Sequence, residues 1–271
     1  MSSVASPISL NSTVTSVSAP KRKGPLRLPT LFMRALAWAS ALTILPACWA
    51  ATLAFARTAP GVFLLSDGAK GWLLAPEAWA MAGGAAFYLL WHRVRPPEFL
   101  YTFAHEMTHL LFALVFFKRV SRLVVARDNG EVAISGTNFF ITLAPYFFPL
   151  LAAAALGAGM VAEWGLGDGR VRLVTSFFTG LGLAFHLTMT LRTLGTSQPD
   201  IQRGGRFFSW SVIYLIGTLL AGASALAAVG GAGALRSLYG NLLREGWAAY
   251  LWSGDRLLAW VRLGVAWASK L

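Results

Sequence analysis

Residues 99–117 form an apolar stretch that one glutamate and two histidines interrupt with the spacing His-Glu-x-x-His, namely His105, Glu106 and His109. Residues four apart lie on one face of an α-helix, so both imidazoles can bind one Zn²⁺ from the same side. Glu106 can then take a proton from a zinc-bound water as a general base. Each ionisable residue inside a membrane helix raises the free energy of insertion by about 2.5–3.5 kcal/mol. Helix packing alone therefore does not explain three such residues on one apolar helix. The other interpretation is a polar cluster at a helix end, hydrated by the headgroup region.

A catalytic zinc ion needs a third protein ligand and keeps a fourth position for water. His186 lies inside the apolar stretch 173–191, at a depth comparable to that of His109 if both stretches cross a membrane in the same direction. Asp200 follows that stretch, and Gly195 and Pro199 break the helix before it, so the chain can fold back there. The residues alone leave both candidates open.

The composition indicates that lipid is the solvent for most of the chain. Of 271 residues, 56% are hydrophobic and only 13% are charged, and the mean hydropathy is +0.59. A chain with so few charges cannot cover a water-facing surface, so we expect a multi-pass integral membrane protein of a plasma or inner membrane. Six stretches are long and apolar enough to span a bilayer: 35–56, 71–91, 99–117, 138–162, 173–191 and 207–229.

The net charge of +12 does not indicate nucleic-acid binding in such a chain. The basic residues lie between apolar stretches, where they set topology and contact anionic headgroups of the bilayer. Cys48 is the single cysteine, so neither an intramolecular disulfide nor a cysteine zinc site is expected. The expected partners are therefore the lipid bilayer and other membrane proteins, and not nucleic acid.

Residues 121–135 have a β pattern rather than a helical one. Valine and isoleucine flank Asn129-Gly130, and Asn-Gly between β-forming residues predicts a hairpin, because both turn positions need positive φ. The fold class that follows is an all-α polytopic membrane protein of about six transmembrane helices, with a short β-hairpin after the third. Because an open sheet edge cannot face hydrocarbon, the hairpin belongs at the interface or in a protein cavity.

These features resemble the site-2 protease family of intramembrane zinc metalloproteases. The resemblance rests on the His-Glu-x-x-His stretch, on the basic hairpin after it, and on a later helix that leads to Pro199-Asp200. In the family, that last region carries an Asn and then an Asp-Gly pair whose Asp is the third zinc ligand. The resemblance implies Zn²⁺ as the cofactor and Asp200 as the third ligand. His186 remains the alternative, because it stands near the expected Asn and Ile201 replaces the expected Gly.

The resemblance also implies hydrolysis of peptide bonds in or beside the transmembrane segments of membrane-protein substrates. Glu106 would be the catalytic residue, and the hairpin around Asn129 and Gly130 would hold the unwound substrate by strand addition. The rival hypothesis is a non-catalytic membrane scaffold, or a chaperone-like relative that keeps the fold. The complete His-Glu-x-x-His pattern favours the enzyme, and the irregular third-ligand region favours the rival.

We expect three regions along the chain. Residues 1–30 read as a disordered basic tail, 31–234 as a membrane-embedded metalloprotease-like domain, and 235–271 as one or two amphipathic helices at the interface. Two signals for orientation conflict. The basic hairpin and the basic tail both favour the cytoplasmic side, yet six spans would place them on opposite sides.

Overall fold

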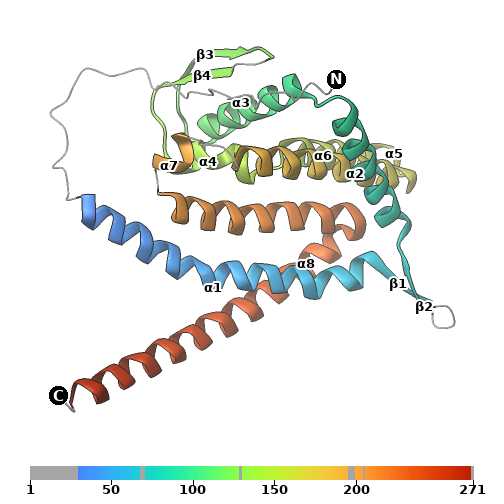
Figure 1. The fold of residues 1–271 in the computed structure, drawn as a ribbon. Coiled ribbons are helices and arrows are strands. Elements are labelled where there is room, and N and C mark those ends of the chain that lie inside the picture. The colour runs from blue at the N-terminus through green and yellow to red at the C-terminus, as the bar shows by residue number, and fades with distance from the viewer. Residues whose placement is uncertain (1–29, 68–70, 128–129, 195–198, 204, 270–271) are drawn as a thin grey trace, which may run out of the picture.

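The computed structural model describes residues 30–67, 71–127, 130–194, 199–203 and 205–269. Helices dominate this part of the chain, and two short antiparallel hairpins interrupt them (Figure 1). The helices are α1 (Thr30–Phe63), α2 (Pro76–Val94), α3 (Glu98–Val115), α4 (Phe139–Phe147), α5 (Leu150–Leu166), α6 (Arg170–Leu194), α7 (Pro199–Arg203) and α8 (Arg206–Ala268). The strands are β1 (Leu64–Asp67), β2 (Gly71–Leu74), β3 (Val120–Val125) and β4 (Gly130–Ile134). The predicted tail 1–30 lies almost entirely outside the described residues.

Three described helices are long and apolar enough to cross a membrane, in α1, α6 and α8, and the bent pair α4–α5 makes a fourth if it counts as one span. This supports an integral membrane protein, but it does not confirm the predicted count of six. α2 and α3 are not among the candidates. α3 carries Glu98 as well as the His-Glu-x-x-His residues, which lower its apolar content.

Two of the predicted spans are corrected by the structure. In the stretch 71–91, residues 71–74 form β2, which pairs with β1, and the helix begins only at Pro76, whose fixed φ suits a first turn. The stretch 138–162 is two helices rather than one. α4 ends at Phe147, α5 begins at Leu150, and the axes meet at 77°, because Pro149 lacks the N–H that a continuous helix needs.

The hairpin predicted after the third apolar stretch is present as β3–β4. Its register pairs Val120 with Ile134 and Val125 with Gly130. The predicted two-residue turn is wrong, because Gly130 is a strand residue rather than a turn residue and does not have a positive φ. Asn129, the other residue of that predicted turn, lies outside the described residues.

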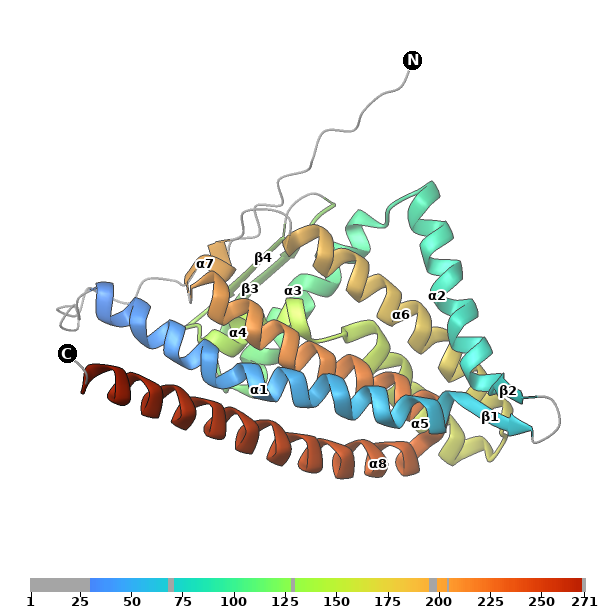
Figure 2. The same ribbon diagram turned by 60° about the horizontal axis from the view of Figure 1, so that its bottom comes forward.

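α8 changes direction at Gly231, whose φ of 62° and ψ of −152° are open to glycine but not to other residues. The helix beyond it, residues 232–268, is called the C-terminal arm here. The arm turns back and runs along α1 (Figure 2), where Asn241 Nδ2 donates to Thr58 Oγ1 at 2.8 Å. The predicted C-terminal helix is therefore a long helix packed on α1, and its place at a membrane interface stays a prediction.

α2 and α6 approach closely because glycine lies on both sides of their contact. A Cβ built on Gly84 would lie 1.9 Å from the carbonyl oxygen of Phe177, and one on Gly180 would lie 2.0 Å from that of Met81. Only residues without a side chain allow backbones this near. The contact holds α6, from which the chain continues toward α7.

Candidate metal centre

α3 presents both histidines of the motif to the protein interior. The imidazole rings of His105 and His109 lie edge to face with centroids 4.9 Å apart, as the four-residue spacing on a helix predicts. His105 is 5% exposed, Glu106 2% and His109 0%. The alternative of a hydrated polar cluster at a helix end is not what the structure shows, because these side chains are buried.

A carbonyl of α4 fixes the ring of His109. Its Nδ1 lies 2.8 Å from the carbonyl oxygen of Ile141. This oxygen lacks a helical donor because the residue four positions later is Pro145, which has no N–H. A carbonyl can only accept, so Nδ1 carries the proton and Nε2 keeps the lone pair that a metal needs. The sequence showed Pro145, but not that the freed carbonyl would meet His109.

The start of α4 is built to hold this carbonyl in place. Asn138 caps the helix, and its Oδ1 accepts a hydrogen bond of 2.9 Å from the backbone N–H of Ile141. The next residues of α4 pack into the core around Leu143 and Phe147. α4 therefore serves as a rigid support for the His109 ring.

Asp200 enters the site from α7, a short helix 91 positions beyond His109 in the sequence. Its neighbour Ile201 is 4% exposed, packs against Leu143 and Phe147 of α4, and accepts a hydrogen bond from Ser209 at its carbonyl oxygen. Ile201 therefore anchors α7, which explains why an apolar residue stands where the family pattern has Gly. Asp200 is 4% exposed, so the anchor holds its carboxylate inside the protein.

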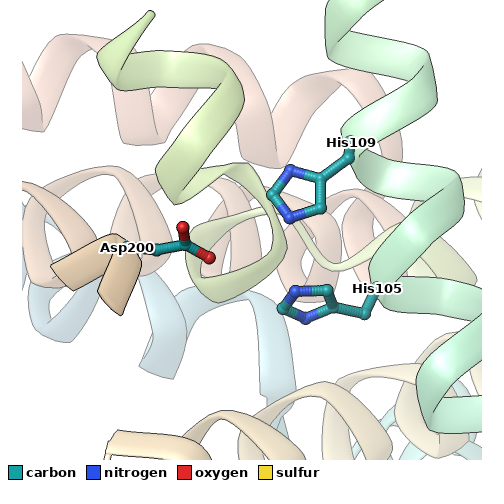
Figure 3. A group of neighbouring side chains, drawn as sticks. All are labelled: His105, His109 and Asp200. Carbon is teal, nitrogen blue, oxygen red and sulfur yellow. The ribbon is translucent and has the colours of Figure 1, made fainter. Parts of the chain in front are cut away.

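The structure brings His105, His109 and Asp200 together. One ligand atom from each lies within 4.8 Å of the others, and Figure 3 shows both imidazoles directed from α3 toward the carboxylate on α7. His186 does not join a cluster of this kind among the described residues. It lies instead on α6, beside a small cavity of about 20 Å³ that His105 also lines. Of the two candidates for a third ligand, the geometry favours Asp200.

The residues present fit a zinc ion. Two histidines and one carboxylate form a donor set of catalytic zinc sites, with one position left for water. Ligands at about 2.0–2.1 Å from a tetrahedral zinc are about 3.3 Å apart, so the three side chains need to close by about 1.5 Å at most. The Nε2 atoms of both histidines are buried and have no hydrogen bond within the described part of the chain. Buried polar atoms are nearly always paired, and a bound metal would account for this pair of orphans.

The hairpin backbone lies directly against the Glu106 side chain. A Cβ built on Gly130 would lie 2.5 Å from Cγ and 2.7 Å from Oε1 of Glu106. The hairpin is tied to α3 at the same end, where Thr102 Oγ1 donates to the carbonyl oxygen of Arg127 at 3.4 Å. Gly130 therefore lies in the site. Its lack of a side chain leaves room for Glu106, and it does not form the predicted turn. The substrate-binding role predicted for Asn129 falls outside the described residues.

Tyr146 of α4 also lies in the site, which the sequence alone did not indicate. Its ring lies edge to face with that of His105 at a centroid distance of 5.6 Å, and its hydroxyl is near the carboxylate of Asp200. Tyr146 is 2% exposed. A buried phenol next to a ligand set can donate a hydrogen bond to a bound oxygen.

The comparison with known families agrees with the geometry. The model of a family described as Peptidase M50B-like matches residues 79–196, somewhat under half of the chain. The matched region contains His105, Glu106, His109 and the hairpin, and it ends before Asp200. The match confirms the resemblance to the site-2 protease family. No curated protein and no solved structure matches the chain at a significant level.

Proposed function

We propose that this protein is an intramembrane zinc metalloprotease that hydrolyses peptide bonds in or near the transmembrane segments of other membrane proteins. One observation carries the proposal, which is the convergence of His105, His109 and Asp200 from two distant segments, with Glu106 beside them. The match of residues 79–196 to a peptidase family supports the same reaction class. The surrounding candidate spans support a site at membrane depth.

His105, His109 and Asp200 would hold the zinc ion, which when bound supplies a Lewis acid that makes water nucleophilic near neutral pH and polarises a carbonyl. Glu106 acts as the general base. Its Oε1 is buried and has no hydrogen bond in the described part of the chain, so it is ready to accept a proton from the attacking water. Glu106 then returns this proton to the amine that leaves. Tyr146 donates a hydrogen bond to the oxygen on which negative charge develops.

The substrate must unwind before its peptide bonds reach the site, because a helix shields its own backbone. β4 is the strand against Glu106, and in the described sheet it pairs only with β3, so its other edge has no strand partner. An unwound segment can add there by main-chain hydrogen bonds, which would place a scissile carbonyl near the site. The buried state of Glu106 and His109 requires the hairpin or α7 to move when the substrate enters.

The test compares the wild-type protein with Glu106→Gln, both purified in detergent and placed in lipid vesicles. Zinc content is measured on each sample, and cleavage is measured on a library of membrane-spanning reporter peptides in the same vesicles. We expect about one zinc in both proteins and cleavage only by the wild type. The drop in rate should be at least about 10²-fold, the range for loss of a general base.

Two results contradict the proposal in different ways. A wild-type protein that folds but binds no zinc removes the metal site, and with it the hydrolase. Zinc binding without cleavage by the wild type leaves the non-catalytic scaffold as the account that fits, whereas equal cleavage by both proteins would refute the role of Glu106. His105→Ala serves as the control that should lose both zinc and cleavage.

A further inference from the structure

A groove runs between α1 and the C-terminal arm of α8, and its character changes along its length. One section, of about 730 Å³, is lined mainly by apolar side chains, including Leu45 and Trp49 of α1 and Trp252 of the arm. The next section along the same helix pair, of about 620 Å³, is lined by Arg57 and Arg244 together with small and polar residues. We call the whole the α1–α8 groove. It lies on helices that carry none of the three candidate ligands, and it is independent of the proposed function.

The two arginines that line the polar section share a single carboxylate, that of the buried Glu245, which lines the adjoining apolar section, so one positive charge is left over. Arg57 Nη1 lies 2.6 Å from Glu245 Oε1, and Arg244 Nε lies 3.8 Å from the same oxygen. The Glu245 side chain is 5% exposed, whereas the two arginine side chains are 55% and 66% exposed. Arg244 also donates from Nη2 to Asn241 Oδ1. Each guanidinium has five N–H groups, so both arginines keep further donors for a ligand. Their planar forks suit a phosphate group.

The two sections lie at the depths of the two halves of a phospholipid. The candidate span Trp38–Phe63 has 26 residues, which is about 39 Å of helix against about 30 Å of hydrocarbon. Arg57 lies six residues before Phe63, about 9 Å from the helix end, where a long side chain reaches the headgroup region. Trp49 lies 14 residues before Phe63, about 21 Å from that helix end and near the middle of the span, at the level of acyl chains.

The polar section also has free space beside two of its glycines. A Cβ on Gly61 or on Gly240 would meet no atom within 4 Å. Glycine here leaves open space rather than allowing a close helix contact, in contrast to Gly84 and Gly180. The positive charge, the depth in the membrane and the free volume of the groove all suit the same kind of ligand.

We propose that the α1–α8 groove binds an anionic phospholipid, with the phosphate at Arg57 and Arg244 and an acyl chain beside Trp49 and Trp252. The bound lipid fills the space between α1 and the arm and supplies the negative charge that the polar section lacks. Since these helices are joined there mainly by side-chain contacts, the lipid stabilises the packing of the arm.

The test uses the full chain in detergent, titrated with phosphatidylglycerol or with phosphatidylcholine of the same acyl chains. Native mass spectrometry reports bound lipid, and thermal unfolding reports Tm. We expect saturable binding and a higher Tm with phosphatidylglycerol, and neither with phosphatidylcholine nor with inorganic phosphate. Arg244→Gln should weaken phosphatidylglycerol binding by about fivefold or more, the effect of one arginine near an anionic headgroup.

Arg262→Gln is the matched control, because Arg262 lies on the same arm but lines neither section. Gly240→Leu is a second variant, which fills the polar section without removing a charge and should also block binding. Equal stabilisation by both lipids, or equal losses in Arg244→Gln and Arg262→Gln, would overturn the proposal. A dimer that Gly240→Leu dissociates would also overturn it, because a second copy of the chain would then fill the groove.

Discussion

A methyl group at Gly130 would occupy space that the Glu106 side chain already fills. An ideal Cβ there lies 2.5 Å from Glu106 Cγ and 2.8 Å from Cδ, whereas ordinary van der Waals contact begins at 3.4 Å. Glu106 is 2% exposed and cannot swing into solvent. In Gly130→Ala, either the carboxylate or β4 therefore moves by about 1 Å.

A displacement of about 1 Å in a catalytic group costs about 10²-fold in rate. We expect Gly130→Ala to lower kcat/KM by about 100-fold on a reporter peptide that the wild type cleaves in vesicles. Zinc content should stay that of the wild type, because neither Gly130 nor Glu106 belongs to the ligand set. The fold should tolerate the change, since Gly130 does not have a positive φ and alanine suits its backbone.

Gly136→Ala is the matched control for this prediction. Gly136 follows the same hairpin, and a Cβ there would meet no atom within 4 Å, so its activity should equal that of the wild type. Full activity of Gly130→Ala with a normal zinc content would refute the reasoning. It would mean that catalysis does not depend on the Glu106 carboxylate staying where β4 holds it.

Three further predictions concern the ligands, their support and the helix packing. Asp200→Ala should lose the zinc measured by elemental analysis, while His186→Leu should keep about one zinc per chain; the reverse result would make His186 the third ligand. Asn138→Ala removes the cap of α4, and its free energy of unfolding should fall by about 0.5–2 kcal/mol in denaturant titrations. Its zinc affinity should fall too, because the carbonyl that orients His109 loses its support; an unchanged affinity would contradict that link. Gly84→Ala should lower stability by about 1–3 kcal/mol, because its Cβ would lie 1.9 Å from the Phe177 carbonyl oxygen. Gly83→Ala, whose Cβ would lie 4.0 Å from the nearest atom, should be as stable as the wild type or up to about 1 kcal/mol more stable, because alanine favours a helix interior. Equal losses in the two variants would speak against the tight contact.

Features set by local periodicity could be predicted from the sequence. The four-residue spacing of His105 and His109 requires a common helix face, and the structure has their rings 4.9 Å apart. The β-forming residues between 121 and 135 were enough for a hairpin. The turn was assigned wrongly because Asn-Gly is a local signal, whereas packing against Glu106 determined the place of Gly130.

The number of spans depends on more than local apolar content. Pro149 separates α4 from α5 inside a stretch that reads as one apolar segment, and residues 71–74 pair with β1 instead of extending α2. Both outcomes depend on neighbouring segments that compete for the same backbone hydrogen bonds. Average hydropathy over a window does not register this competition.

The sequence by itself indicated the membrane class, the pair of histidines on one helix face, the glutamate beside them, and the two candidates for a third ligand. Only the tertiary structure brings one of those candidates, Asp200, to the histidines across 91 positions, through the packing of Ile201 on α4. The tertiary structure also brings the carbonyl that Pro145 leaves free to His109, and it returns the C-terminal arm along α1. Contacts between distant segments depend on how whole helices pack, and no local pattern of residues encodes that packing.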